Sequence, residues 1–131
     1  MKPGPSMTDN PSHASRPWPS EIKLKKADRI LEVIFEGGQA YSLSAEYLRI
    51  ESPSAEVQGH GTGHKTIVPG KRHVAITSLE PVGNYAVRII FDDGHDSGLF
   101  TWETLYRLGH NHDQIWADYI AALTDKGLSR D

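Results

Sequence analysis

Hydrophobic and polar residues alternate over several short stretches of the chain, as they do in strands with one buried face. The stretches with this alternation, or with runs of β-branched and aromatic residues, are 22–25, 30–35, 39–43, 74–79, 85–91 and 95–100. Gly37-Gly38 and Asp93-Gly94 lie between successive strands and are typical of tight hairpin turns. A two-residue turn at Asp93-Gly94 would place Asp92 directly opposite His95. The pattern therefore predicts a mainly antiparallel sheet made of hairpins.

A helical spacing of apolar residues marks three further segments. Ser44 and Thr101 are typical helix-capping residues, and each precedes such a segment. Gly109 is expected to end the helix that Thr101 begins, and a third helix is expected to end at Gly127. This third helix has an apolar stripe made of Trp116, Tyr119, Ile120 and Leu123. Because strands come first and helices last, we predict an α+β fold with a short helix and two C-terminal helices packed on one face of the sheet.

Two segments have neither a strand nor a helix pattern. Residues 1–19 hold five prolines and almost no apolar side chain before Trp18, so we expect a disordered N-terminal tail. Residues 51–72 are rich in Ser, Pro, Gly and His, and we expect one long His- and Gly-rich loop there, a feature that is often functional. The expected organisation is a single domain over residues 20–127, followed by a C-terminal tail at 128–131.

Composition narrows the class of protein. The 131 residues hold 14 Lys and Arg against 17 Asp and Glu, a net charge of −3, so no overall basic field attracts nucleic acid. The absence of cysteine excludes disulfides, iron–sulfur clusters held by this chain's own thiols, and Cys-containing zinc sites. No apolar stretch approaches the ~20 residues of a membrane span, and the first residues lack the apolar region of a secretory signal. We therefore expect a cytoplasmic protein that binds neither nucleic acid nor membrane.

Seven histidines stand out in this composition. His60 and His64 are four residues apart, a spacing that would align two metal ligands on a helix. The glycines around them disfavour a helix, however. A loop site for a metal or an anion is therefore one interpretation of this pair, and a solvated loop without a ligand is the other.

His95 is surrounded by carboxylates in the cluster 92–96. A neighbouring Asp can fix the tautomer of an imidazole and favour its charged form, which suits a metal ligand or a general base. The same residues also suit an ordinary hairpin turn, in which an Asp–His cross-strand pair contributes roughly 0.2–1 kcal/mol. Ser97 lacks the strand-to-helix turn of a nucleophile elbow, so no hydrolase triad is predicted.

Two longer stretches, 45–57 and 83–102, resemble the family of small bacterial domains named gamma-butyrobetaine hydroxylase-like, N-terminal. The resemblance covers about residues 18–127. Members of this family occur alone, ahead of the oxygenase domain of gamma-butyrobetaine hydroxylase relatives, and fused to ATPases of the iron–sulfur carrier type. Oxygenase activity is not implied for this chain, because the iron ligands of the oxygenase belong to a separate domain.

The resemblance also bears on zinc. The hydroxylase version looks like a zinc-binding module with three cysteines after the short helix and one histidine in the hairpin. His95 matches that histidine. Ser52, Ser54 and Val57 stand at or near the cysteine positions, and none of them can replace a thiolate. The resemblance therefore implies that this zinc site is absent here.

Two functional hypotheses follow. The first is a non-catalytic accessory module that binds a protein partner of the oxygenase or iron–sulfur class through the loop 51–72 and the hairpin around His95. Its expected interaction surface consists of Tyr47, Arg49, Asp93 and Asp96. The second is a metal-binding domain for zinc or iron, with no other cofactor expected. Its ligands would be His95, His60 and His64, with Asp92 orienting His95. No catalytic residue is predicted, so we do not expect an enzyme.

Overall fold

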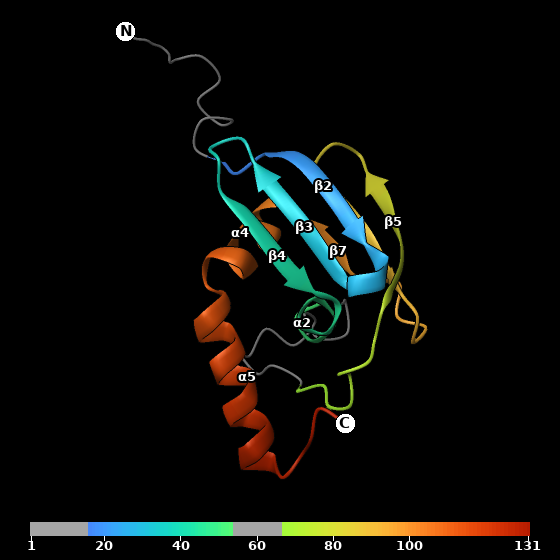
Figure 1. Ribbon diagram of the computed structural model, residues 1–131, viewed down its shortest axis with the longest axis vertical. Helices are drawn as coiled ribbons and strands as arrows, with labels where there is room; N and C mark the ends of the chain where they lie inside the picture. The colour runs from blue at the N-terminus through green and yellow to red at the C-terminus, as the bar shows by residue number, and fades with distance from the viewer. Residues whose placement is uncertain (1–15, 54–66) are drawn as a thin grey trace, which may run out of the picture.

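The computed structural model of the protein describes residues 16–53 and 67–131. Its strands form two three-stranded antiparallel sheets, with the orders β2-β3-β4 and β5-β6-β7 (Figure 1). A short helix, α2, follows the first sheet, and two helices, α4 and α5, follow the second. The predicted α+β class is confirmed, and the predicted hairpins are divided between two sheets.

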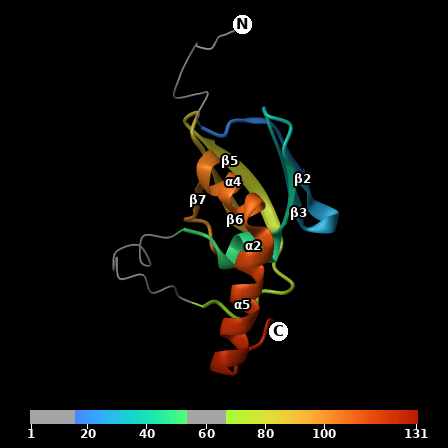
Figure 2. The same cartoon turned by 90° about the vertical axis from the view of Figure 1, so that its left-hand side faces the viewer.

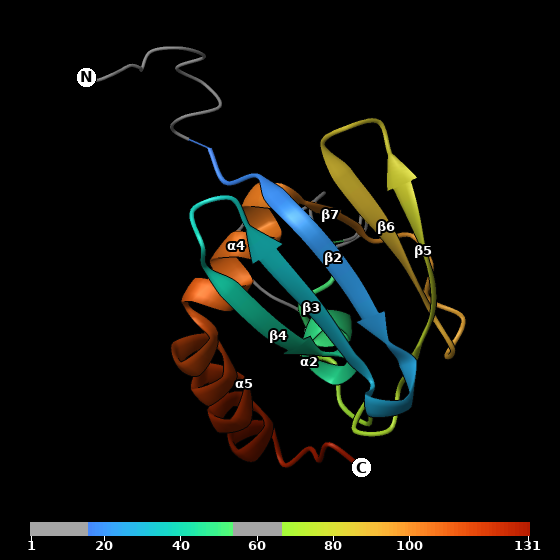
Figure 3. The same cartoon turned by 45° about the horizontal axis from the view of Figure 1, so that its top comes forward.

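The first sheet comprises β2 (Pro19–Lys25), β3 (Ile30–Phe35) and β4 (Ala40–Ser44). Figure 3 shows its three strands side by side with β3 in the centre. The alternation in β3 buries Leu31, Val33 and Phe35. The turn to β4 contains Gly38 with φ +96°, a conformation that strains other residues. β2 begins at Pro19, which suits the first residue of an edge strand because it has no N–H to donate.

The helix α2 (Ala45–Ile50) starts directly after β4. The side chain of Ser44 caps it as predicted, because its oxygen accepts a hydrogen bond from the backbone N–H of Tyr47 at 3.1 Å. Of its six residues only Arg49 is not buried. α2 therefore presents a single charged side chain to solvent at its C-terminal end.

The second sheet comprises β5 (Ile76–Val82), β6 (Ala86–Phe91) and β7 (Leu99–Thr101). β7 is shorter than the predicted strand 95–100. The backbone N–H of Phe91 donates to the carbonyl of His95 at 3.0 Å, so three residues separate the bonded pair. Gly94, the third of them, has φ +91°. The two-residue turn, and with it the direct opposition of Asp92 and His95, was therefore a wrong prediction, because Gly94 closes a three-residue loop.

The C-terminal helices are α4 (Trp102–His110) and α5 (His112–Lys126). Thr101 caps α4 as predicted, with its hydroxyl accepting from the N–H of Thr104 at 3.1 Å. Gly109 does not end α4. It lies inside the helix, where a Cβ would come 2.3 Å from the ring of Tyr41 on β4. Gly127 does end α5, in the left-handed conformation with φ +67°.

The core joins the inner faces of both sheets to all three helices. Figure 2 shows the sheets as two layers, with α2 near one end of them and α5 extending beyond that end. The largest fully buried side chains are Tyr47, Phe100, Leu31, Leu43, Leu48, Ile89, Leu105, Leu108 and Val33. This packing leaves the end of α2 beside the loop that joins β6 to β7.

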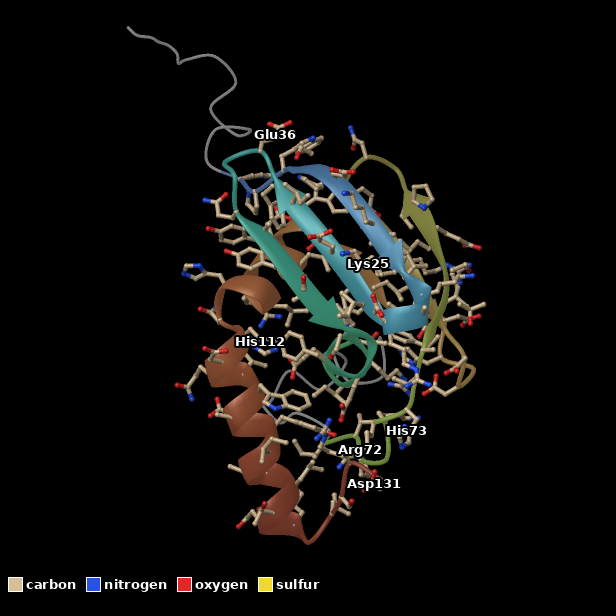
Figure 4. All side chains as sticks on the ribbon, viewed as in Figure 1. Lys25, Glu36, Arg72, His73, His112 and Asp131 are labelled. Atoms are coloured by element: carbon tan, nitrogen blue, oxygen red, sulfur yellow. The ribbon has the colours of Figure 1, made fainter. Side chains whose placement is uncertain are left out.

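Residues 128–131, expected to be a tail, pack back onto the domain. The N–H groups of Gly70 and Arg72 donate to the carbonyls of Ser129 and Arg130 at 3.0 and 3.1 Å. Arg72 and Asp131 form an ion pair, and Figure 4 shows these two side chains next to each other. The segment that leads into β5 is thus held in place by the end of the chain.

Candidate functional site

Charged side chains from three segments meet at the end of α2. The Nε of Arg49 donates to Oδ2 of Asp93 at 2.9 Å, and the ammonium of Lys71 donates to the same oxygen at 2.6 Å. The other oxygen of Asp93, Oδ1, accepts from the backbone N–H of His95 at 3.1 Å. Arg49, Lys71 and Asp93, here named the Asp93 cluster, thereby join α2, the segment before β5 and the β6–β7 loop.

The Asp93 carboxylate is strongly held in its ionised form. The residue as a whole is exposed, but its side chain is only 19% exposed because the two cations cover it. Burial alone would raise the pKa of Asp93, but the hydrogen bonds from Lys71, the His95 backbone and Arg49 outweigh burial and lower that pKa to about 2. Within the cluster, two cations share one carboxylate charge near neutral pH.

Next to this cluster, Ser52 contacts His95. The Ser52 hydroxyl oxygen lies 2.9 Å from Nε2 of the His95 ring. Gly98 also packs closely against the serine, since a Cβ at position 98 would lie 2.0 Å from Ser52 Oγ. The phenyl ring of Phe91 lies 6.0 Å from the imidazole, centroid to centroid. Ser52 thus contacts both the imidazole and a stretch of backbone that carries no side chain.

The structure separates the predicted surface residues. Arg49 and Asp93 come together, and Asp96 is exposed in the same loop as Asp93, with its backbone carbonyl accepting from Arg88 at 2.9 Å. Tyr47 was wrongly placed on this surface. It is fully buried, and its hydroxyl donates to the carbonyl of Leu108 at 2.7 Å, so it belongs to the core.

The structure describes two of the four residues predicted for the metal site, His95 and Asp92. His60 and His64 lie outside the described residues. The carboxylate of Asp92 was expected to orient His95. Its oxygen Oδ1 instead accepts a hydrogen bond from the backbone N–H of Ala75 at 3.0 Å. The N–H of Asp92 in turn donates to the carbonyl of Ala75 at 2.9 Å. Asp92 thus continues the pairing between β5 and β6.

The zinc site that the resemblance implies for hydroxylase relatives does not fit this chain. The structure does bring Ser52, at or near one of the cysteine positions, next to His95. A neutral hydroxyl is a poor zinc ligand compared with a thiolate, however. In the described ranges 16–53 and 67–131, no three His, Cys, Asp or Glu residues are grouped so that they could hold a metal ion.

Two residues of the site were missed from the sequence as functional candidates. Lys71 lies in the long loop and carries no local signal, because its partner Asp93 is 22 residues away. Ser52 enters the sequence analysis only as a residue at or near a cysteine position of the hydroxylase relatives. A search of the helices in the described part of the chain finds none that is long and apolar enough to cross a membrane.

The fold and the site together define a small α+β domain with a charged surface at the end of α2. The family model described as gamma-butyrobetaine hydroxylase-like, N-terminal, matches residues 22–106. The chain belongs to this family, whose described members include proteins of unknown function. A search of curated proteins finds no match.

Solved structures support this assignment. One NMR solution structure of a protein is 48% identical, with 89% of this chain and 92% of that chain covered and a TM-score of 0.77. A second NMR structure is 45% identical, with 95% and 90% covered and a TM-score of 0.77. A crystal structure of a protein of unknown function from Acidithiobacillus ferrooxidans, of the DUF971 family, is 42% identical, with 70% and 91% covered and a TM-score of 0.59.

Proposed function

We propose that this domain is a non-catalytic module that binds a protein partner through the surface formed by the Asp93 cluster, His95 and Asp96. The observation that carries the proposal is the convergence of Arg49, Lys71 and Asp93 from three separate segments. Their hydrogen bonds hold these side chains in place before any partner arrives. Binding through a preorganised surface loses less side-chain entropy than binding through free side chains.

The electrostatics of the site support recognition over acid–base catalysis. An efficient general base has a pKa near the working pH. The pKa of Asp93 is about 2, far below neutrality, so this carboxylate is a poor proton acceptor there. The partner class is an expectation from the resemblance, in which the domain accompanies an oxygenase or an ATPase of the iron–sulfur carrier type.

Site-specific photo-crosslinking tests this proposal. A photoreactive residue placed at Asp96 in the full chain is expected to crosslink a partner in native cells. The same residue at Glu21, which is exposed on β2, serves as the matched control. The captured partner is then purified and its affinity measured by calorimetry. We expect Asp96→Trp, whose large side chain obstructs the surface, to weaken binding at least about tenfold and Glu21→Trp to leave it unchanged. Equal affinities of the two variants, or equal crosslinking from both positions, would reject the proposed surface.

Metal binding is the second function that we propose for testing. What supports it is the place of His95, whose ring contacts Ser52 just before the chain continues toward His60 and His64. Three neutral imidazoles would suit zinc with one open position. Elemental analysis of untagged protein should then find about one zinc or iron per chain, and His95→Ala should remove it. Metal-free protein whose unfolding midpoint does not change on addition of zinc or iron would contradict this function.

A further inference from the structure

The two cations of the Asp93 cluster have hydrogen-bonding capacity left over. Arg49 uses only Nε for Asp93, and a guanidinium carries four more N–H groups on its two Nη atoms. Lys71 uses one of its three ammonium protons. Within residues 16–53 and 67–131 the remaining donors of both side chains make no further hydrogen bond. They are therefore available to a ligand.

The cluster also holds more positive than negative charge. Arg49 and Lys71 both contact the same oxygen of Asp93, so one carboxylate charge is set against two cations. A single ion pair would be enough to join α2 to the β6–β7 loop. The side chains of Arg49 and Lys71 are 16% and 22% exposed, so their charges are less screened than those of fully exposed side chains.

We propose that Arg49 and Lys71 bind a carboxylate of an acidic peptide segment in the partner. This inference rests on the function proposed above and names the chemistry of the partner. The free edge of a guanidinium matches the two oxygens of a carboxylate, and the adjacent ammonium adds a point charge. Asp93 holds both cations next to each other, and its Oδ2 uses only Nε of Arg49 and one ammonium proton of Lys71. An acidic segment fits this arrangement, whereas a basic one would be repelled.

NMR titration of the full ¹⁵N-labelled chain tests the proposal. The probes are a blocked tetraglutamate peptide, a blocked tetralysine peptide and inorganic phosphate. We expect tetraglutamate to cause saturable shifts at the amides of Asp93, Gly94 and His95, and tetralysine to cause none. Arg49→Gln and Lys71→Gln should each weaken the peptide about tenfold, as expected for loss of a charge-assisted hydrogen bond. Lys23→Gln is the matched control, because it removes one exposed cation from β2 and should leave the affinity unchanged.

The possible outcomes separate this inference from the function on which it rests. Peptide shifts that map elsewhere, or an affinity that neither variant lowers, overturn it. Binding of phosphate without binding of tetraglutamate also overturns it. Lys71→Gln, in the segment before β5 and outside any helix or strand, remains a valid test if Arg49→Gln does not fold. A partner that crosslinks at Asp96 but binds Arg49→Gln and Lys71→Gln normally would overturn the acidic peptide while leaving the interaction function intact. Saturable tetraglutamate binding at the cluster without any crosslinked partner would count against the interaction function alone.

Discussion

The hydroxyl of Ser52 lies 2.9 Å from Nε2 of His95, which joins the segment that follows α2 to the loop between β6 and β7. Gly98 makes this contact possible, because its backbone passes so close to the serine that no side chain fits between them. The Asp93 cluster links the same two segments a few residues away. The candidate surface is therefore held by two neighbouring sets of polar contacts.

Gly98→Ala should destabilise the domain and break the contact between Ser52 and His95. The new methyl group would lie 2.0 Å from Ser52 Oγ and 3.3 Å from the ring of Phe100. Overpacking of this kind costs about 1–3 kcal/mol of unfolding free energy. Urea unfolding measures the loss, and the His95 ring signals in NMR report the contact.

A double variant separates this clash from a general effect of alanine at position 98. Ser52→Ala removes the oxygen that the methyl group would meet, so Gly98→Ala should cost less in that background. Ser97→Ala in the adjacent position should change the free energy of unfolding by less than about 0.5 kcal/mol. Equal costs of Gly98→Ala in the two backgrounds would show that the serine is not the obstacle.

Asp93 should make the domain sensitive to acid. Its pKa is lowered from 3.8 to about 2 in the fold, so its stabilising effect is fully present above pH 3.8 and is lost as the pH falls through about 2. The site is partly screened by solvent, so we expect about 1 kcal/mol at neutral pH. Urea unfolding of the wild type and Asp93→Asn should differ by this amount at pH 7 and converge toward pH 2.

Asp125→Asn is the control for this pH dependence. Asp125 is exposed on α5, so removing its charge should leave the unfolding curves nearly unchanged at every pH. A difference between the wild type and Asp93→Asn that is the same at pH 7 and pH 2 would contradict the role given to the ionised carboxylate.

Features that depend on neighbouring residues were predictable from the sequence. Ser44 and Thr101 cap their helices and Gly127 ends α5, because capping involves atoms within a few residues. The candidate site depends instead on distant pairs. Arg49 and Asp93 are 44 residues apart, and no local pattern indicates that they meet. The site could therefore be predicted only as a set of separate candidates.

The wrong predictions have the same origin. Gly109 follows a helical pattern, and a glycine in that position is typical of a helix end. The residue is glycine for a different reason, because α4 packs against Tyr41 on β4. Asp93-Gly94 suits a two-residue turn, yet Asp92 pairs with Ala75, which directly precedes β5, and the loop is one residue longer. In both cases a tertiary contact decides which of two local alternatives forms.

Gly109→Ala should lower stability even though alanine favours helices. The gain in helix propensity is about 1 kcal/mol. Against it stands a methyl group only 2.3 Å from Cγ of Tyr41, a ring carbon that cannot move freely because the ring packs edge-on against Phe35 and Tyr106. Overpacking costs about 1–3 kcal/mol, so the net effect is a loss, measurable by thermal unfolding. In a Tyr41→Gly background, which also removes the Cβ of residue 41 that lies 2.8 Å from the new methyl group, the same change should be stabilising, and a loss of equal size there would contradict this explanation.

Arg130→Met should destabilise the domain because it leaves a buried carboxylate without its cation. Glu46 on α2 has a side chain only 7% exposed, and the Arg130 guanidinium makes two hydrogen bonds to it, at 2.7 and 2.8 Å. Breaking a buried pair costs about 3–5 kcal/mol, and the partial exposure of Arg130 reduces the expected loss to about 2 kcal/mol. Glu46→Gln in the same chain should restore part of the lost stability, since no unpaired charge then remains buried.

The control is Lys126→Met, which removes a cation from the exposed end of α5 and should leave urea unfolding nearly unchanged. If Arg130→Met behaved like Lys126→Met, the residues after α5 would not contribute to the stability of the fold.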